Sequence, residues 1–332
     1  MESKVAFLTE MGFEGKVPAN HSNMRTEFAW MHALDADHRH IHHYVEVQGY
    51  DHVFVIFPKG KTFLSAEGSR LVKGVNPISE LLKLDLVGTL KKHNKKVYYV
   101  QEGPHWWFND YEIIDQINFY NMLTKVDLIF AHNKSDVDYY LGLVQKRVAV
   151  MPTLMLEHSI SDVQWKPEEK AIVGGNFARW YGGFESFIVA QNFEVPIWGQ
   201  TSHATRDNEG QLIHQLPRVM WTDWIKQLST FKYAVHLMPT VAAGTFALNC
   251  AYLGIPCIGN EDVDTQNNCH PDLSVRVGDI QHARELAYML KEDKDFYQHC
   301  SELAKMNYKA HYTVDTWKAT MKKILTTLDE AE

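Results

Sequence analysis

The sequence predicts an α/β protein with two doubly wound domains, each a parallel sheet wrapped by helices. Three observations lead to this prediction. The chain has 332 residues, which suits two domains of about 150 residues each. Short apolar runs alternate with amphipathic stretches along the whole length. The strand-like runs are apolar almost throughout, as expected for strands that are buried on both faces of a parallel sheet.

Apolar runs in both halves of the chain are predicted to be strands. In the first half they are KVAFLTE, HVFVIF, KKVYYVQE, KVDLIFAHN and RVAVMP, and in the second half KAIVGGNF, VPIWG, YAVHLMP, PCIGN and LSVRV. Amphipathic stretches between them predict helices near residues 22–35, 78–94, 110–123, 135–145, 182–192, 222–231, 244–254 and 279–293. Further helices are expected near 294–311 and 315–330.

The domain boundaries follow from a polar linker over residues 152–170, which is bounded by prolines. We expect an N-terminal domain over residues 1–158 and a C-terminal domain over residues 165–311. No strand follows the last helices, so residues 312–332 are expected to form a helix that packs back on the N-terminal domain.

Composition narrows the classes of protein. The formal net charge of −8 argues against a surface coated in positive charge for nucleic acid, although it leaves room for a local basic face. The four cysteines form no CxxC pair, so neither a zinc ribbon nor a disulfide framework is indicated. No apolar run approaches the length of a membrane span. We expect a cytoplasmic monomer that does not enter membranes.

The stretch AIVGGNFARWYGG has the chemistry of a pyrophosphate site. A strand that ends in Gly174 and Gly175 exposes backbone N–H groups, the following helix adds its positive end, and Arg179 can lie over a diphosphate. Asn176 belongs to the same turn and is included among the predicted ligand contacts. The alternative is a tight turn with a surface arginine.

Two other glycine-containing loops are predicted to line the same crevice at the carboxyl ends of the strands. In AAGTFALN, Gly244 keeps the approach to a helix open, and Thr245 can either donate to a phosphate oxygen or simply cap the helix. In TEMGFEGKVPANHSN, Gly12 and Gly15 allow the backbone to approach a ligand closely.

The order of these motifs resembles that of a known family. The segment VMWTDWIKQLSTFKYAVHLMPTVAAGTFALNCAYLGIPCIGN is similar to the donor-binding half of GT-B glycosyltransferases, with an apolar base-contacting loop and a helix that ends in Gly-x-Pro. The whole chain resembles the bacteriophage DNA β-glucosyltransferase group, which modifies 5-hydroxymethylcytosine. That likeness lies in KVAFLTEMGF, YDHVFVIF, KKVYYVQEG, AIVGGNFARWYGGFES, VPIWGQ and CIGNEDVDTQ.

The resemblance implies a GT-B fold, in which two Rossmann-like domains face each other across a cleft. The N-terminal domain would bind the acceptor, and the C-terminal domain would bind a UDP-sugar as co-substrate. The family's glycine pair maps onto Gly174 and Gly175, its phosphate-contacting arginine onto Arg179, and its ribose-binding glutamate onto Asn249. The arginine that precedes this glutamate in the family has no counterpart in TFALN. These departures leave the sugar open, so it need not be glucose.

The implied reaction is transfer of a glycosyl group to a hydroxyl, with a general base that takes the hydroxyl proton. The family's catalytic aspartate follows the YY strand, and the nearest carboxylate here is Glu102, one position short of a gapless match. Glu102 could instead be a solvated loop carboxylate, and Asp110 and His105 on the same loop are alternative bases. Trp106 and Trp107 can stack on a sugar or an extruded base, or pack in the core.

If the acceptor is double-stranded DNA, positive charge must gather on the first domain. The segment FPKGKTFLSAEGSRLVKG, which contains Lys59, Lys61 and Arg70, is the predicted DNA-contacting loop. A base in a duplex would also have to leave the stack to reach the donor. In this interpretation the chain is encoded by a phage and acts in the cytoplasm of the host cell.

The cluster DADHRHIHH over residues 35–43 is rich in metal-ligand side chains, and DAD has the look of the Asp-x-Asp motif of GT-A transferases. The cluster also lies where the first helix should end, and histidine caps and exposed polar side chains are common there. A divalent metal such as Mg²⁺ or Mn²⁺ is compatible with the sequence but not required by it, so no residue is assigned as a metal ligand.

Three functions are open at this point. The first is a hexosyl- or pentosyltransferase that moves a sugar from a UDP-sugar to a hydroxymethylated base of phage DNA, with 5-hydroxymethylcytosine as the expected base. The second is a GT-B enzyme that acts on a small molecule, a glycan or a protein, which the acidic net charge favours. The third is a non-enzymatic protein that binds a sugar nucleotide, for which the missing ribose glutamate is the main observation.

Overall fold

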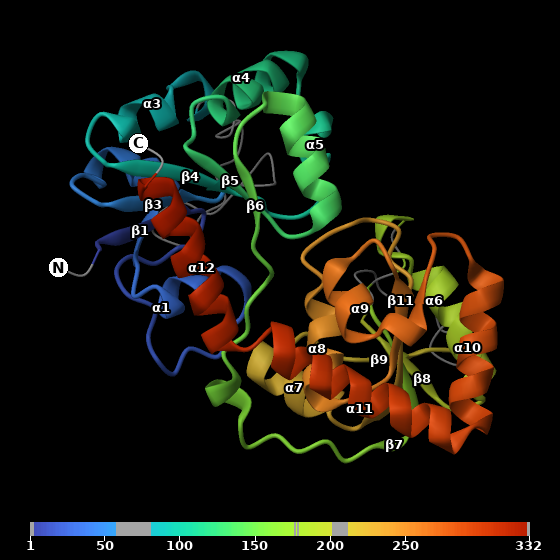
Figure 1. The fold of residues 1–332 in the computed structure, drawn as a ribbon. Coiled ribbons are helices and arrows are strands. Elements are labelled where there is room, and N and C mark those ends of the chain that lie inside the picture. Colours follow the sequence, from blue (N-terminus) through green and yellow to red (C-terminus); the bar gives the residue numbers. More distant parts are fainter. Residues whose placement is uncertain (1–2, 58–80, 176, 178, 201–211, 331–332) are drawn as a thin grey trace. The chain divides into compact units, whose positions relative to one another are not determined.

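The computed structural model describes residues 3–57, 81–175, 177, 179–200 and 212–330 (Figure 1). The chain forms two compact units. Unit 1 comprises Met1–His21, Glu27–Pro152 and Lys318–Glu332, and unit 2 comprises Ser22–Thr26 and Thr153–Trp317. Residues 22–26 and 153–158 therefore belong to unit 2, although the linker in the sequence places them with the N-terminal domain. Each unit is built on its own six-stranded sheet.

The sheet of unit 1 is parallel throughout and has the strand order β2-β1-β3-β4-β5-β6. Its strands are β1 (Val5–Thr9), β2 (Asp37–His40), β3 (His52–Val55), β4 (Lys96–Val100), β5 (Leu128–Ala131) and β6 (Val148–Val150). The helical elements are α1 (Thr26–Ala33), η1 (Ile41–Glu46), α3 (Leu86–Lys91), η2 (Trp107–Asp110), α4 (Ile113–Leu123) and α5 (Lys134–Val144), and α12 (Val314–Asp329) runs into this unit.

Side chains bury both faces of this sheet. Strands β1, β3, β4 and β5 are buried at every position. Helices α3, α4 and α5 pack against one face of the sheet through a shared apolar core. On the other face, Phe7 stacks on Phe54 with ring centroids 4.7 Å apart, and Trp30 of α1 meets Phe130 edge-on. This double burial accounts for the continuous apolar runs in the sequence.

The edge strand β2 corrects the prediction that residues 35–43 end a helix. Helix α1 stops at Ala33, and Asp35 adopts a left-handed φ of 45°. The chain then pairs in parallel with β1, and the inward side chains of β2 are His38 and His40, both fully buried. Sequence reasoning misses this strand because histidines take the positions at which apolar residues usually mark a buried face.

The sheet of unit 2 is also parallel and has the strand order β12-β11-β10-β7-β8-β9. Its strands are β7 (Glu168–Val173), β8 (Ile197–Gly199), β9 (His214–Gln215), β10 (Phe231–His236), β11 (Cys257–Asn260) and β12 (Ser274–Val275). The α-helices are α6 (Gly183–Ala190), α7 (Trp221–Leu228), α8 (Thr245–Leu253), α9 (Asp264–Cys269), α10 (Ile280–Glu292) and α11 (Lys294–His311). The 3₁₀ turns are η3 (Glu157–Ile160), η4 (Arg179–Tyr181), η5 (Gln191–Phe193) and η6 (Pro271–Leu273).

Strands β7 and β10 mark the switch point of this sheet. They are neighbours in space, but the chain runs outward from β7 to β8 and β9 on one side and from β10 to β11 and β12 on the other. Loops diverge at such a point and leave a crevice at the carboxyl ends of the strands, which is where open α/β sheets bind ligands.

The core of unit 2 packs around the same strands. Phe193 of η5 stacks on Tyr233 of β10 with ring centroids 4.1 Å apart. All four cysteines are free and buried, so no disulfide contributes to this fold. Helix α9 and the two-residue strand β9 were absent from the predicted elements. None of the helices in the described ranges is long and apolar enough to span a membrane.

Candidate functional site

A cavity of about 560 Å³ opens in unit 2 at the carboxyl ends of β7 and β10. Its walls come from the turns after β7 and β8, the start of α7, the first turns of α8, and the segment 22–26. The volume lies within the range of roughly 300–1,000 Å³ that is typical of small-molecule sites. Four of the predicted ligand contacts line it: Gly174, Gly175, Thr245 and Asn249.

The turn after β7 has room only for glycine. Gly175 has a φ of 79°, and a Cβ there would lie 2.9 Å from the carbonyl oxygen of Tyr181. A Cβ on Gly174 would lie 2.7 Å from Cγ of His236, at the end of β10. The bare backbone of this turn therefore packs against His236 and also forms part of the cavity wall, where its peptide groups are accessible to a ligand.

Helix α8 begins at the cavity. Gly244 is the N-cap, with a φ of 67°, and its carbonyl oxygen accepts a hydrogen bond from Thr265 Oγ1 at 2.8 Å. Thr245 is the first helical residue and lines the cavity, so it is not the N-cap that the sequence left as an alternative. Gly244 serves the close packing of the helix start, because a Cβ there would collide with Thr265.

Apolar side chains form the wall at the start of α7. Val219 and Met220, which precede the helix, are exposed, and Trp221 and Trp224 lie on its first turn. The indole Nε1 of Trp221 donates to Asn249 Oδ1 at 3.4 Å, and Asn249 is only 2% exposed. Since the carbonyl oxygen of Asn249 faces Trp221, the group that this side chain can offer to a ligand is its amide N–H.

The cavity is suited to a negatively charged ligand. Its described lining includes Arg25 and Arg218 and contains no aspartate or glutamate. The Nε of Arg25 donates to Asn23 Oδ1 at 3.2 Å. The N-termini of α7 and α8 add the positive ends of two helix dipoles. Cationic side chains and helix N-termini together are the usual means of binding phosphate groups.

Three residues of the cavity lining are not among the contacts predicted from the sequence: Asn23, Arg25 and Arg218. Asn23 and Arg25 reach the cavity because residues 22–26 run beside residues 154–156, with backbone hydrogen bonds between Thr26 and Leu154 and between Leu156 and Met24. Nothing near Arg25 in the sequence signals that pairing. Arg218 does carry a signal, since it directly precedes the apolar loop VMW that leads into α7.

Several predicted contacts lie elsewhere or outside the described residues. Gly12 and Gly15 are in unit 1 after β1, and Gly15, with a φ of 94°, exchanges backbone hydrogen bonds of 2.9 and 2.8 Å with His38. The structure does not describe the residues Asn176, Lys59, Lys61 and Arg70, nor the side chain of Arg179.

In unit 1, the predicted bases follow β4 at the carboxyl edge of the sheet. Glu102 is half-buried, and Asp110 is exposed at the end of η2. Burial lowers the pKa of His132 after β5, and the nearby Glu102 carboxylate partly opposes that shift. His105 Nδ1 lies 2.8 Å from Oδ1 of Asp136, a fully buried residue of α5. This edge therefore combines carboxylates and a histidine that can accept protons.

The three consecutive aromatic residues after β4 separate in the structure. Phe108 is buried and packs on Phe119 of α4, with ring centroids 4.8 Å apart. Trp106 and Trp107 are only partly buried, and their rings lie 6.3 Å apart at an interplanar angle of 28°. Core packing is thus the role of Phe108, whereas the two tryptophans keep surface that can stack on a ring.

The histidine-rich cluster is mostly occupied by structural contacts. His38 bonds to Thr9 Oγ1 at 2.8 Å and to the Phe13 carbonyl at 2.6 Å. Burial lowers the pKa of His38 to about 4. The two aspartates of DAD, Asp35 and Asp37, both pair with Lys16, at 3.2 and 3.4 Å. The Asp-x-Asp spacing is therefore explained by an ion-pair cluster beside an edge strand.

One histidine of this cluster, His43, has metal-ligand geometry together with two carboxylates outside it. Glu14, His43 and Glu46 offer ligand atoms within 4.8 Å of one another. His43 Nδ1 already lies 2.6 Å from Glu14 Oε1, so a hydrogen bond accounts for the contact between two of the three residues. Exposed carboxylates of this kind specify a metal site only weakly.

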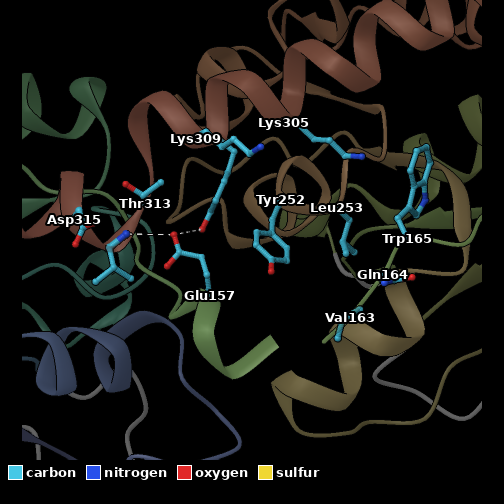
Figure 2. Close-up of a pocket in the computed structure, with 12 residues that line it drawn as sticks. Glu157, Val163, Gln164, Trp165, Tyr252, Leu253, Lys305, Lys309, Thr313 and Asp315 are labelled. Carbon is cyan, nitrogen blue, oxygen red and sulfur yellow. Dashed lines mark hydrogen bonds between the residues drawn. The ribbon is translucent and has the colours of Figure 1, made fainter. Parts of the chain in front are cut away.

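A larger cavity of about 740 Å³ lies between η3, the end of α8 and the junction of α11 and α12 (Figure 2). Glu157 Oε1 accepts hydrogen bonds from the Tyr308 hydroxyl at 3.0 Å and from the Val314 amide at 3.3 Å. Lysines share this lining with Glu157 and Asp315, so its charge is mixed. It also lies away from the carboxyl edge of the sheet, and we assign the ligand site to the first cavity.

No protein-family model and no curated protein matches the sequence. Solved structures do match it. The Anabaena protein Alr3699/HepE, in complex with UDP-glucose, has a TM-score of 0.67 at 10% identity, covering 98% of this chain and 100% of that one. The phage T4 alpha-glucosyltransferase, in complex with UDP and a 13-mer DNA that contains a central A:G mismatch, has a TM-score of 0.62 at 10% identity, covering 98% and 99%.

The chain has the GT-B fold. A third match, sucrose-phosphate synthase from Thermosynechococcus elongatus, has a TM-score of 0.61 at 12% identity and covers 88% of this chain and 77% of that one. The predicted fold class is confirmed, and the resemblance to phage DNA glucosyltransferases is confirmed at the level of the fold. The matched phage enzyme is an alpha-glucosyltransferase, whereas the sequence motifs resemble the β group.

Proposed function

We propose that this chain is a nucleotide-sugar-dependent glycosyltransferase that binds a UDP-sugar in the cavity of unit 2. The observation behind the proposal is the composition of that cavity, in which two helix N-termini and two arginines surround a glycine turn and the described lining has no carboxylate. The matched structures support it, since HepE was solved with UDP-glucose and the alpha-glucosyltransferase with UDP.

The diphosphate, the base and the ribose of the donor each have a proposed contact. The diphosphate lies against the turn of Gly174 and Gly175 and the start of α8 at Thr245, where N–H groups and helix dipoles stabilise negative charge. Arg218 neutralises part of that charge. The uracil base packs on the apolar wall before α7, and Asn249 donates to a ribose hydroxyl. Asn176 and Arg179 remain donor contacts proposed from the sequence alone. Gly12 and Gly15 lie in unit 1, and Gly244 packs the start of α8 against Thr265, so we do not place them against the donor.

The proposed transfer forms one bond and breaks one. An acceptor hydroxyl oxygen bonds to the anomeric carbon, and the bond from that carbon to the β-phosphate oxygen breaks. UDP leaves with the bonding electron pair, and the positive groups of the cavity stabilise it. The hydroxyl proton passes to a base, for which Glu102, His105 and Asp110 of unit 1 are the candidates.

For the acceptor, we propose a hydroxymethylated base in double-stranded DNA, with 5-hydroxymethylcytosine first. The sequence resemblance supports this choice, as does the DNA bound in the matched alpha-glucosyltransferase structure. Trp106 and Trp107 would stack on the extruded base. The net charge of −8 favours a small molecule, glycan or protein as the alternative acceptor.

The test is a panel of UDP-sugars, incubated with the protein in the presence and absence of DNA that contains 5-hydroxymethylcytosine. UDP release and the mass of the DNA are measured. We expect release that depends on the modified DNA, with a matching mass increase, and no incorporation into the same duplex with plain cytosine. UDP release without DNA modification would favour another acceptor. Binding of a UDP-sugar without any turnover would favour a non-enzymatic role, and no binding would contradict the proposal.

A further inference from the structure

His105 and Asp136 form a histidine–carboxylate pair at the carboxyl edge of the unit 1 sheet. His105 follows β4, and Asp136 lies in the first turn of α5, which follows the neighbouring strand β5. The Nδ1–Oδ1 distance is 2.8 Å. Asp136 is 0% exposed, whereas the His105 side chain remains 25% exposed. One partner is thus sealed in the protein, and the other reaches the surface of this edge.

The pair determines which nitrogen of His105 carries the proton. A carboxylate only accepts hydrogen bonds, so the close contact with Asp136 Oδ1 requires a hydrogen on Nδ1. The second carboxylate oxygen, Oδ2, accepts from Asn133 Nδ2 at 3.0 Å, which fixes the orientation of the carboxyl group. In the neutral ring, Nε2 therefore presents a lone pair and acts as a hydrogen-bond acceptor.

The ring of His105 is also held from a second side. Tyr139, one turn along α5 from Asp136, stacks on it with ring centroids 4.1 Å apart and an interplanar angle of 30°. Two contacts from one helix thus fix both the plane and the tautomer of the imidazole. A solvent-exposed histidine without a functional role needs neither restraint. A group that must contact a substrate atom in one geometry benefits from both.

We infer that Asp136 is a positioning residue, which holds His105 so that its Nε2 accepts a hydrogen bond from a substrate hydroxyl during glycosyl transfer. This inference rests on the proposed function. The hydroxyl belongs either to the acceptor or to the donor sugar. For the acceptor, the O–H proton moves to Nε2 as the oxygen bonds to the anomeric carbon, and Asp136 stabilises the imidazolium. For the sugar, the contact orients the donor and no proton moves.

The experiment compares Asp136→Asn, His105→Asn and the double variant. The amide of His105→Asn can still donate to Asp136 but has no group in the place of Nε2. We expect Asp136→Asn and His105→Asn each to lower kcat/KM for transfer by about tenfold or more, and the double variant to be no worse than His105→Asn. Tyr288→Phe changes an exposed tyrosine of α10 and is the control, with unchanged kcat/KM.

Two assays identify the source of the hydroxyl. Loss of transfer alone, with UDP-sugar hydrolysis and donor KM unchanged, assigns it to the acceptor. A raised donor KM in hydrolysis without acceptor assigns it to the sugar. If Asp136→Asn lowers the Tm strongly, Asn133→Ala replaces it, since that change removes the donor to Oδ2 and keeps the Asp136 carboxylate, and a smaller loss in the same direction is expected.

Two results would overturn the inference without touching the proposed function. One is transfer activity that stays at the wild-type level in both single variants, Asp136→Asn and His105→Asn. The other is an Asp136→Asn effect that is equally large in the His105→Asn background, because a merely structural role would persist without the histidine. A wild-type protein that neither binds nor turns over any UDP-sugar would overturn both proposals together.

Discussion

The indole N–H of Trp221 donates to the side-chain oxygen of Asn249 across the wall of the unit 2 cavity, at 3.4 Å. This bond links the first residue of α7 to the middle of α8. A carboxylate at position 249 could accept the same bond, but it would add a negative charge to a cavity whose described lining has none. The amide thus keeps the polar contact and preserves the preference of the cavity for anions.

Asn249→Ala should raise the donor KM and the Kd of UDP. The variant loses the amide that we place against the ribose and leaves the Trp221 indole N–H without its acceptor. A lost hydrogen bond of this kind costs about 1 kcal/mol, or roughly fivefold in Kd. Isothermal titration with UDP measures this directly, with Trp221→Phe to separate loss of the indole bond from loss of the amide. An unchanged Kd would remove Asn249 from the site.

Arg218→Ala should weaken UDP binding by about tenfold or more, because hydrogen bonds to charged groups contribute roughly 1.5–3 kcal/mol. The loss should shrink at high salt, since Arg218 is exposed and its charge is screened. Arg284→Ala is the matched control, because Arg284 is exposed on α10 and does not line the cavity. Equal Kd values for the two variants would argue against the cavity as the diphosphate site.

Gly175→Ala should destabilise the fold and impair UDP binding together. The substitution places a methyl group 2.9 Å from the Tyr181 carbonyl oxygen at a φ of 79°, and each kind of strain costs about 1 kcal/mol or more. Gly142→Ala is the control, since Gly142 lies within α5 and a Cβ there meets nothing within 4 Å. That change should raise the Tm slightly. A Gly175→Ala protein with wild-type Tm and Kd would contradict the need for a bare backbone.

Acid should destabilise the protein between about pH 6.5 and pH 4. Burial lowers the pKa of His38 in unit 1 and of His270 in unit 2 from 6.5 to about 4. In this window the unfolded chain binds more protons than the folded chain, so the free energy of unfolding falls as the pH falls. Each histidine accounts for roughly 2–3 kcal/mol of that loss.

Urea unfolding at several pH values measures the slope of this dependence. The slope should be shallower in His270→Gln, which removes one of the buried histidines whose pKa is lowered by burial. His282→Gln changes an exposed histidine of α10 and is the control for the loss of a histidine at the surface. A wild-type free energy of unfolding that is constant from pH 6.5 to pH 4.5 would show that these histidines do not stay neutral when folded.

The contact between Glu157 and Tyr308 should stabilise unit 2 (Figure 2). Tyr308 is 3% exposed, and burial raises the pKa of its hydroxyl above the ordinary value. Because the acceptor is a carboxylate, we expect a coupling energy of about 1–2 kcal/mol in a double-mutant cycle of Glu157→Gln and Tyr308→Phe. Chemical denaturation of the four proteins gives this value, and additive effects would mean that the hydrogen bond contributes nothing of its own.

The fold was largely predictable because its strands are buried on both faces. Such strands must be apolar at every position, so β1, β3, β4 and β5 stand out as continuous runs. Edge strands lack this signal. The inward positions of β2 are His38 and His40, and β9 consists of His214 and Gln215 alone. Each of these strands is recognisable only from its pairing with a neighbour.

Residues of the candidate site were predictable where a residue type suited to phosphate binding lies beyond the carboxyl end of a predicted strand. Gly174 and Gly175 directly follow β7, and Thr245 begins the helix after β10, so the rule that ligands bind at carboxyl ends places them at the cavity. The contact between His105 and Asp136 was not predictable from either segment alone, because the loop after β4 and the first turn of α5 meet only through the β4–β5 pairing. The place of Asn23 and Arg25 in the cavity lining was not predictable for a related reason, since it depends on a partner segment far away in the sequence.

The route of the chain through residues 22–26 limits how this protein can be divided. These five residues belong to unit 2, while the chain on either side of them belongs to unit 1. A protein cut at residue 153 would therefore separate Asn23 and Arg25 from the cavity that they help to form. A chimera that receives only the C-terminal half would have an incomplete ligand site. An exchange that preserves binding must also include residues 22–26.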